Sequence, residues 1–138
     1  MKPAREEEID FTIYTLKHLN FLLPHIKGIR KMITTLVQIK LSETLSLKKA
    51  QDIFASTAPK YLEIKGLTRK YYILSEDGET AGGVYLWESR KAAEMLYTDE
   101  WKKFIFQKYG SEPSLTYFNS PVIVDNLLGK VIKDDKTY

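Results

Sequence analysis

The chain has 138 residues, enough for one domain with a substantial core, and its 43% hydrophobic and 28% charged residues are typical of a globular protein. The formal net charge of +3 is not gathered in a basic cluster, which argues against a nucleic-acid-binding protein. Cysteine is absent, so disulfides, thiolate metal sites and cysteine nucleophiles are excluded.

The first 31 residues differ in character from the rest of the chain. They open with acidic side chains, continue with apolar residues at a partly helical spacing, and reach Pro24 and Gly28. We predict an N-terminal helical extension over residues 1–31 that the main domain does not need in order to fold. Both histidines, His18 and His25, lie in it, so the rest of the chain lacks the most common general base and metal ligand.

No segment has the pattern of a membrane span or a secretory signal. The longest apolar-looking run, residues 11–23, is too short and is interrupted by polar side chains. Glutamates stand near the start, where a secretory signal would carry positive charge. We therefore expect a cytoplasmic protein without a membrane partner.

The main domain begins with a strand and a helix. A β-branched run predicts a strand over residues 32–41, in which Val37 and Ile39 share one face. Ser46 can then cap a helix over residues 46–60, because its hydroxyl can accept a hydrogen bond from an otherwise unpaired backbone N–H.

Two aromatic-rich strands follow and form a hairpin. The first covers residues 67–74 and the second residues 80–87. Between them, Asp77 and Gly78 tolerate the positive φ angles that a tight hairpin turn requires. These two strands are therefore expected to be antiparallel neighbours.

Two helical segments and a last strand complete the domain. Ser89 can cap a short helix, and Thr98, followed by two acidic residues, can cap another that ends at Gly110. A strand over residues 115–124 comes next. The chain is thus divided into an N-terminal extension, a main domain and a loose, charged C-terminal tail: residues 1–31, 32–128 and 129–138.

The predicted element order is β-α-β-β-α-β, a ferredoxin-like α+β fold with a four-stranded antiparallel sheet. Both helical regions would cover one face of this sheet and leave the other face open. Alternation along the strands is expected to place an aromatic and partly basic set of side chains on the open face, which a homodimer would cover. That set is Gln38, Lys40, Lys70, Tyr72, Tyr85, Trp87 and either Tyr117 or Phe118.

Three segments resemble the YdhR-type mono-oxygenase family of the dimeric α+β barrel superfamily. They read KGLTRKYYI, AGGVYLWESRKAAEMLY and SPVIVDN, and the resemblance extends over roughly residues 32–126. It implies a homodimer whose two sheets face one another as a barrel, with a pocket between each sheet and its helices or loops. Superfamily relatives include oxygenases that act on polyketide quinols without a cofactor, haem-degrading enzymes and isomerases.

The candidate site combines aromatic walls with a few polar groups, which is what oxygenation without a cofactor requires. We assign catalytic roles to Lys70, which could stabilise a phenolate or enolate, and to Tyr72, which could donate a hydrogen bond. The alternative for Lys70 is an extended side chain that reaches the rim of the barrel. Substrate contacts are expected from Gln38, Lys40, Tyr85, Trp87, Tyr117 and Asn119. Strand aromatics also commonly fill a core or a dimer interface, so that alternative stays open for the aromatic members.

The predicted function is a cofactor-independent mono-oxygenase acting on a small aromatic, polyketide-like or quinol-like substrate. Neither a cofactor nor a metal is expected, because the main domain contains no histidine and no cysteine. The competing hypothesis is a non-catalytic dimer of the same fold that binds or senses a small apolar or aromatic molecule. An isomerase is a further possibility within the superfamily.

Overall fold

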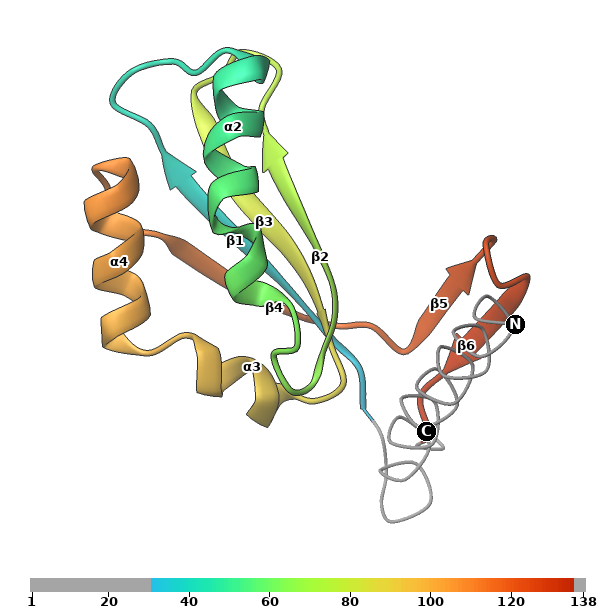
Figure 1. The fold of residues 1–138 in the computed structure, drawn as a ribbon. Coiled ribbons are helices and arrows are strands. Elements are labelled where there is room, and N and C mark those ends of the chain that lie inside the picture. Colours follow the sequence, from blue (N-terminus) through green and yellow to red (C-terminus); the bar gives the residue numbers. More distant parts are fainter. Residues whose placement is uncertain (1–30, 136–138) are drawn as a thin grey trace, which may run out of the picture. The chain divides into compact units, whose positions relative to one another are not determined.

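Four antiparallel strands form the central sheet, in the order β2-β3-β1-β4 (Figure 1). In the computed structural model, which describes residues 31–135, they are β1 (Ile33–Lys40), β2 (Leu67–Leu74), β3 (Thr80–Trp87) and β4 (Ser114–Asn119). This order places β1 and β3 in the centre, as in the ferredoxin-like arrangement, so the predicted fold class is confirmed. The predicted N-terminal helix lies outside the described residues and stays a prediction.

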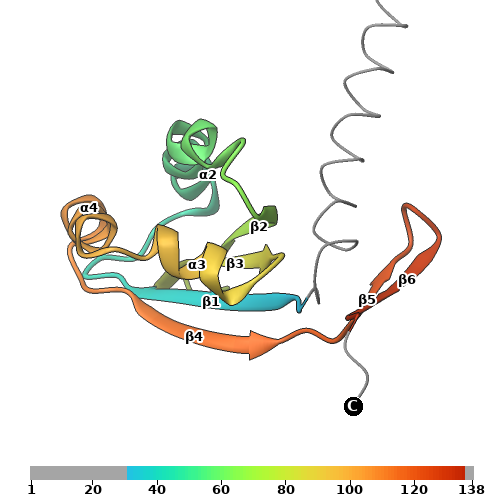
Figure 2. The same cartoon turned by 90° about the horizontal axis from the view of Figure 1, so that it is seen from below.

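The helices of the described residues lie on one face of the sheet (Figure 2). They are α2 (Leu47–Thr57), the short 3₁₀-helix η1 (Ala58–Tyr61), α3 (Arg90–Leu96) and α4 (Asp99–Tyr109). Within the described part of the chain, none of them is long and apolar enough to cross a membrane.

Side-chain caps determine where these helices begin. The hydroxyls of Ser46, Ser89 and Thr98 each accept a hydrogen bond from a backbone N–H of the first helical turn, at 3.1–3.2 Å. Gly110 ends α4 with φ of 83°, a left-handed conformation that glycine adopts without steric penalty. All four of these helix boundaries agree with the sequence prediction.

The register between the strands decides which side chains enter the core. β1 pairs with β3 so that Ile33 lies opposite Trp87 and Thr35 lies opposite Tyr85. Side chains of directly opposed residues point to the same face of a sheet. Tyr85 and Trp87 therefore share a face with Val37, and this is the buried face that packs against the helices.

The predicted aromatic open face is wrong for Lys70, Tyr72, Tyr85 and Trp87, which all lie on the helix-covered face, with Tyr85 and Trp87 buried. Gln38 and Lys40 lie on the opposite face and are exposed. The physical reason is the register: a shift of one residue between neighbouring strands moves a whole set of side chains to the other face.

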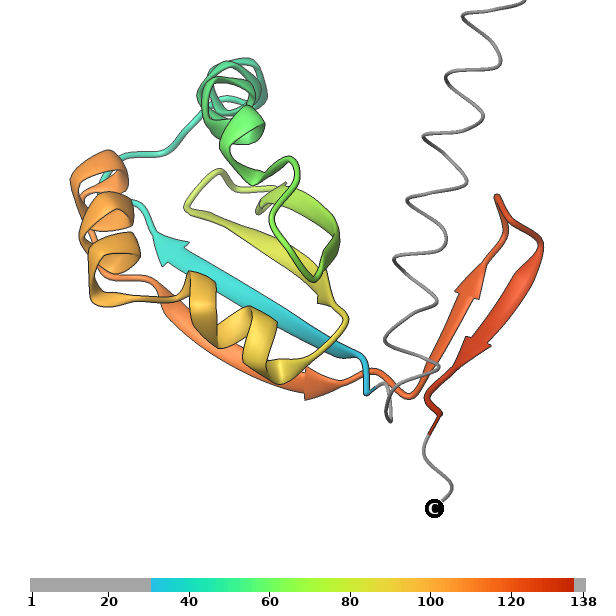
Figure 3. The same cartoon turned by 60° about the horizontal axis from the view of Figure 1, so that its bottom comes forward.

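The C-terminal region contains a hairpin that the sequence analysis did not predict. The expected strand over residues 115–124 is interrupted at Ser120 and Pro121, and its second part is a separate strand, β5 (Val122–Asp125). β5 pairs with β6 (Lys130–Lys133), which lies in the segment expected to be a loose tail (Figure 3). Proline lacks the N–H needed for a sheet hydrogen bond, which explains the interruption.

Candidate functional site

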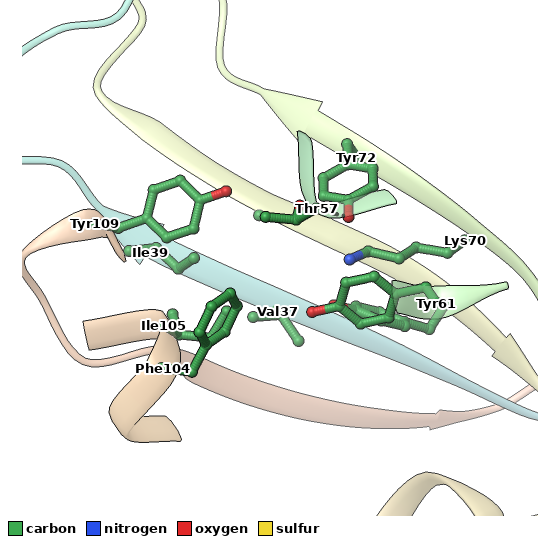
Figure 4. A pocket seen from close by; sticks show the side chains of 11 residues that line it. Val37, Ile39, Thr57, Tyr61, Lys70, Tyr72, Phe104, Ile105 and Tyr109 are labelled. Atoms are coloured by element: carbon green, nitrogen blue, oxygen red, sulfur yellow. Dashed lines mark hydrogen bonds between the residues drawn. The ribbon is translucent and has the colours of Figure 1, made fainter. Parts of the chain in front are cut away.

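A hollow lies between the helix-covered face of the sheet and the surrounding helices (Figure 4). Its cavity volume is about 20 Å³, room for roughly one water molecule, so a substrate-sized ligand has to move the surrounding side chains apart. Its walls are apolar and aromatic, with a single charged side chain. The residues that line it are Val37, Ile39, Thr57, Tyr61, Lys70, Tyr72, Gly82, Tyr85, Phe104, Ile105 and Tyr109.

Lys70 is that charged side chain, and three tyrosine rings surround its amine. Its Nζ lies 3.2 Å from the ring centroid of Tyr61, 3.7 Å from that of Tyr72 and 4.7 Å from that of Tyr85. Figure 4 shows the amine reaching from β2 into the space between Tyr61 and Tyr72. The faces of aromatic rings attract a cation, so this cage can hold the ammonium form of Lys70.

The same surroundings also favour the neutral amine. Burial lowers the pKa of Lys70 from its ordinary value of 10.5 to about 7, because the apolar walls solvate a charge poorly. Among residues 31–135, no carboxylate forms an ion pair with Lys70. At neutral pH the hollow can therefore hold either form of this amine, which allows it both to accept a proton and to stabilise an anion.

The tyrosine hydroxyls provide the other polar atoms of the hollow. Burial raises the pKa of Tyr72, raises that of Tyr85 far above the ordinary value, and raises that of Tyr109 to about 12. All three hydroxyls consequently keep their protons at neutral pH. The Tyr72 hydroxyl is hydrogen-bonded to the hydroxyl of Thr57 at 2.9 Å, which fixes its position beside the amine.

A buried hydrogen-bond network supports the hollow from below. The indole N–H of Trp87 donates to the Thr35 hydroxyl at 3.0 Å, and that hydroxyl also bonds the hydroxyl of Tyr97 at 2.5 Å. The Trp87 ring stacks on Tyr85, with 6.0 Å between centroids and 7° between planes. Burying these polar groups is favourable only because each has a partner, so the network holds Tyr85 in a defined orientation.

Gly83 makes room for the Lys70 side chain. A methyl group on Gly83 would lie 2.8 Å from the Tyr85 ring and 3.3 Å from Cε of Lys70. Because β3 carries no side chain at this position, the Lys70 side chain can pass over Gly83 and enter the hollow.

Three of the eight predicted site residues come together in the hollow: Lys70, Tyr72 and Tyr85. The other five are not brought together with them. Gln38 and Lys40 lie on the opposite face of the sheet, and Trp87 is fully buried behind Tyr85. Tyr117 lies on the helix side but contacts Arg90, whose guanidinium is 4.0 Å from the ring centroid. Asn119 is exposed at the end of β4.

Several lining residues were missed by the sequence analysis. Tyr109 is spaced four and eight residues from Ile105 and Trp101, so the helical spacing of α4 could have placed it on the inward stripe. Tyr61 follows Pro59 in η1 and belongs to no periodic pattern, so no comparable signal exists for it. Its hydroxyl accepts a hydrogen bond from the Trp101 indole at 3.1 Å, and this contact joins α4 to the cage around Lys70.

No group of three or more His, Cys, Asp or Glu side chains suited to a metal ion is present within residues 31–135. The polar chemistry of the hollow is therefore that of one amine and several hydroxyls.

Solved structures with the same fold include proteins named as monooxygenases or oxygenases. A protein from Bordetella bronchiseptica, whose name proposes an antibiotic biosynthesis monooxygenase, gives a TM-score of 0.51 at 15% identity, covering 66% of this chain and 98% of that one. A monooxygenase from Streptomyces coelicolor, in complex with nanaomycin D, gives a TM-score of 0.51 at 15% identity, covering 66% of this chain and 88% of that one. SnoaB, a cofactor-independent oxygenase from Streptomyces nogalater, gives a TM-score of 0.50 at 14% identity, covering 65% of this chain and 93% of that one.

At these identities the likeness shows the fold alone. The chain has the α+β fold of these antibiotic biosynthesis monooxygenase structures. No protein-family model matches the sequence, and no curated protein matches it either.

Proposed function

We propose that this protein is a cofactor-independent mono-oxygenase that oxidises a small aromatic or quinol-like substrate held in the hollow beside Lys70. The observation that carries the proposal is the Lys70 amine, which lies in an apolar, tyrosine-lined cavity and has a pKa of about 7. The likeness of the fold to SnoaB and to the nanaomycin D-bound monooxygenase supports the same class of reaction.

The first step is removal of a proton from the substrate. The neutral Lys70 amine accepts a proton from a phenol, or from the acidic CH₂ group of an anthrone-like ring, and becomes an ammonium ion. That ion then lies beside the anion it has created, where the apolar walls make the attraction strong. The hydroxyls of Tyr61 and Tyr109 donate hydrogen bonds to the substrate oxygen, while the Tyr72 hydroxyl, which donates to Thr57, holds its ring beside the amine.

The electron-rich anion then reacts with dioxygen, which is the co-substrate. One electron passes to dioxygen, the two radicals combine through a new C–O bond, and the Lys70 ammonium returns its proton to the resulting peroxide. Cleavage of the O–O bond, with loss of the remaining C–H proton to the departing hydroxide, leaves a new carbonyl group and one water molecule. One oxygen atom thus enters the product and the other becomes water.

Oxygen uptake with anthrone as the probe tests this proposal. We expect the protein to accelerate oxygen consumption and anthraquinone formation, and Lys70→Met to lower the rate by about 10²-fold or more, the usual effect of removing a general base. Lys48→Met, which changes an exposed lysine on α2, serves as the matched control. A wild-type rate equal to that of buffer, or an undiminished rate in Lys70→Met, would exclude the proposed mechanism. Anthraquinone binding without oxygen uptake would favour the binding or sensing alternative.

We further propose that the protein is a homodimer formed through the open face of the sheet. Figure 2 shows no described element covering this face. It presents six apolar side chains among polar ones that include Gln38 and Lys40, and exposed apolar side chains grouped in this way are typical of an interface. The set comprises Leu36, Tyr71, Ile73, Val84, Leu86 and Phe118, of which Tyr71 is 54% exposed and Phe118 50% exposed.

Membership in the YdhR-type family remains part of this proposal. It is supported by the AGGVYLW segment of β3 and by the SRKAA start of α3, which the structure places directly after it.

A further inference from the structure

The geometry around Lys70 suits a second kind of chemistry, in which the amine itself forms a covalent bond. A lysine reacts as a nucleophile when its amine is unprotonated, is not held by a carboxylate, and faces a space that a small molecule can enter. In the hollow, the rings of Tyr61 and Tyr72 lie against the amine within 3.7 Å, while its remaining side is directed into the cavity (Figure 4). None of the lining residues is an acid.

We propose that Lys70 condenses reversibly with small aromatic or apolar aldehydes and ketones, forming an imine inside the hollow. This inference concerns the same amine as the proposed function, but it requires neither dioxygen nor a quinol. The two proposals can therefore succeed or fail separately.

The condensation balances without any further reactant. The lone pair of the neutral amine attacks the carbonyl carbon, a C–N bond forms, and the C=O π electrons move to oxygen, which takes up a proton. The nitrogen loses a proton to give the neutral carbinolamine, the C–O bond breaks with protonation of the departing hydroxyl, a C=N bond forms, and the nitrogen loses its second proton. Amine and carbonyl compound thus give an imine and one water molecule.

The hollow provides the groups that these proton transfers need. The hydroxyl of Tyr72 lies on the ring that contacts the amine, and Figure 4 shows the hydroxyls of Tyr61 and Tyr109 directed into the same space. Because burial raises the pKa of Tyr109, its hydroxyl keeps a proton to donate at neutral pH, whereas the Tyr72 proton is donated to Thr57. A hydrogen-bonded carbonyl oxygen is also more electrophilic, so the same hydroxyls activate the ligand.

The walls define the chemical class of the ligand. Val37, Ile39 and Phe104 provide apolar contacts, while the aromatic rings of the cage offer stacking surfaces. The cavity volume of about 20 Å³ holds roughly one water molecule, so a ligand enters from the open side only as these side chains move apart. An aromatic aldehyde combines the required carbonyl with a flat ring that can stack on the cage.

Reductive trapping with benzaldehyde tests the inference on the full chain. The protein is incubated anaerobically at pH 7 with benzaldehyde and cyanoborohydride, which reduces an imine to a stable benzylamine. Peptide mass spectrometry then gives the rate of benzylation at each lysine. An amine of pKa about 7 has roughly a thousandfold larger neutral fraction at pH 7 than an ordinary lysine. Since nucleophilicity falls with pKa, we expect a selectivity for Lys70 of at least about tenfold over exposed Lys48.

Two controls make the outcome decisive. Lys70→Arg should abolish the fast benzylation, whereas Lys48→Arg should leave it unchanged. Wild-type protein unfolded in guanidinium should lose the selectivity, since the hollow no longer exists. Benzylation of Lys70 no faster than that of Lys48 in the folded wild type would overturn the inference, and this result needs no variant to fold.

Discussion

Nζ of Lys70 lies 3.2 Å from the centroid of the Tyr61 ring, so a lysine in the edge strand β2 is covered by a residue from the short helix η1. The Tyr61 hydroxyl is in turn bonded by the indole of Trp101 in α4. The environment of the amine thus depends on three elements that meet only in the folded protein. Its chemistry and its cost in stability should therefore both be measurable.

Lys70→Met should stabilise the protein in a pH-dependent way. The pKa of Lys70 is lowered in the folded state, so keeping the amine charged destabilises the fold below about pH 7, where the unfolded chain is protonated as well. This penalty disappears as the pH rises from about 7 towards 10.5. Of the groups facing the amine, Tyr72 and Tyr85 stay neutral over most of that range, because burial raises the pKa of both.

We expect Lys70→Met to raise the free energy of unfolding by about 2–4 kcal/mol at pH 6, with the cation–π contacts of the lysine reducing the full burial penalty. The difference should shrink by pH 9.5. Urea unfolding at the two pH values measures it, with Lys48→Met as the control. Equal stability of wild type and Lys70→Met at pH 6 would contradict the burial of a charged amine.

Thr35→Val should destabilise the fold, although the two side chains have nearly the same shape. It removes a hydroxyl that is fully buried and that bonds both the Trp87 indole and the Tyr97 hydroxyl. Leaving these groups with fewer partners should cost about 1–3 kcal/mol in urea unfolding. Thr116→Val, at an exposed position in β4, should change stability by less than about 0.5 kcal/mol. Similar values for the two variants would show that the network does not support Tyr85.

The two adjacent glycines of β3 should respond differently to alanine. A methyl group on Gly82 would lie 1.9 Å from the Val37 carbonyl oxygen, a backbone atom that cannot move aside, so Gly82→Ala should prevent stable folding. On Gly83 the methyl would meet the Tyr85 ring and the flexible stem of Lys70. Gly83→Ala should therefore fold and lose activity towards anthrone. A folded Gly83→Ala variant with full activity would mean that the position of Lys70 does not matter.

The proposed dimer can be tested by comparing substitutions on the open face of the sheet with substitutions on its helix-covered side. The wild type should have about twice the 16.0 kDa mass of one chain in light scattering. Tyr71→Asp and Phe118→Asp place charges on the open face and should yield folded monomers, while Phe106→Asp, at an exposed position on α4, should remain a dimer. Trp87→Asp should unfold, since its indole is fully buried. A monomeric wild type would refute the dimer.

Local signals were sufficient to predict the strands and helices up to the end of α4 (Asp99–Tyr109). The caps at Ser46, Ser89 and Thr98 depend on hydrogen bonds within one helical turn, so residue type and spacing identify them. The turn at Asp77 and Gly78 is equally local: the Asp77 carboxylate accepts from the Glu79 N–H at 2.9 Å, and Gly78 has φ of 74°. The hairpin was missed because β5, VIVD, reads as a continuation of the preceding strand, and β6, KVIK, is a short strand between two lysines in a charged segment.

The site was only partly predictable, because alternation assigns side chains to faces within one strand but not between strands. Lys70 and Tyr85 were correctly grouped, since a tight turn joins their strands and they are directly opposed. Gln38 was wrongly added to this group, because nothing local reveals the register of β1 against β3. Tyr61 and Tyr109 enter the hollow from helix ends, and such contacts depend on tertiary packing.

The titration of Lys70 tests the account most directly, because both proposed reactions require a neutral amine in the folded protein near pH 7. With ¹³C-labelled lysine, the ε-carbon signals can be followed by NMR from pH 5 to 11, and Lys70→Arg identifies the signal of Lys70. We expect that one signal to titrate near pH 7 and the signals of the exposed lysines to titrate near the ordinary value of about 10.4. A Lys70 signal that titrates together with the exposed lysines would contradict the account.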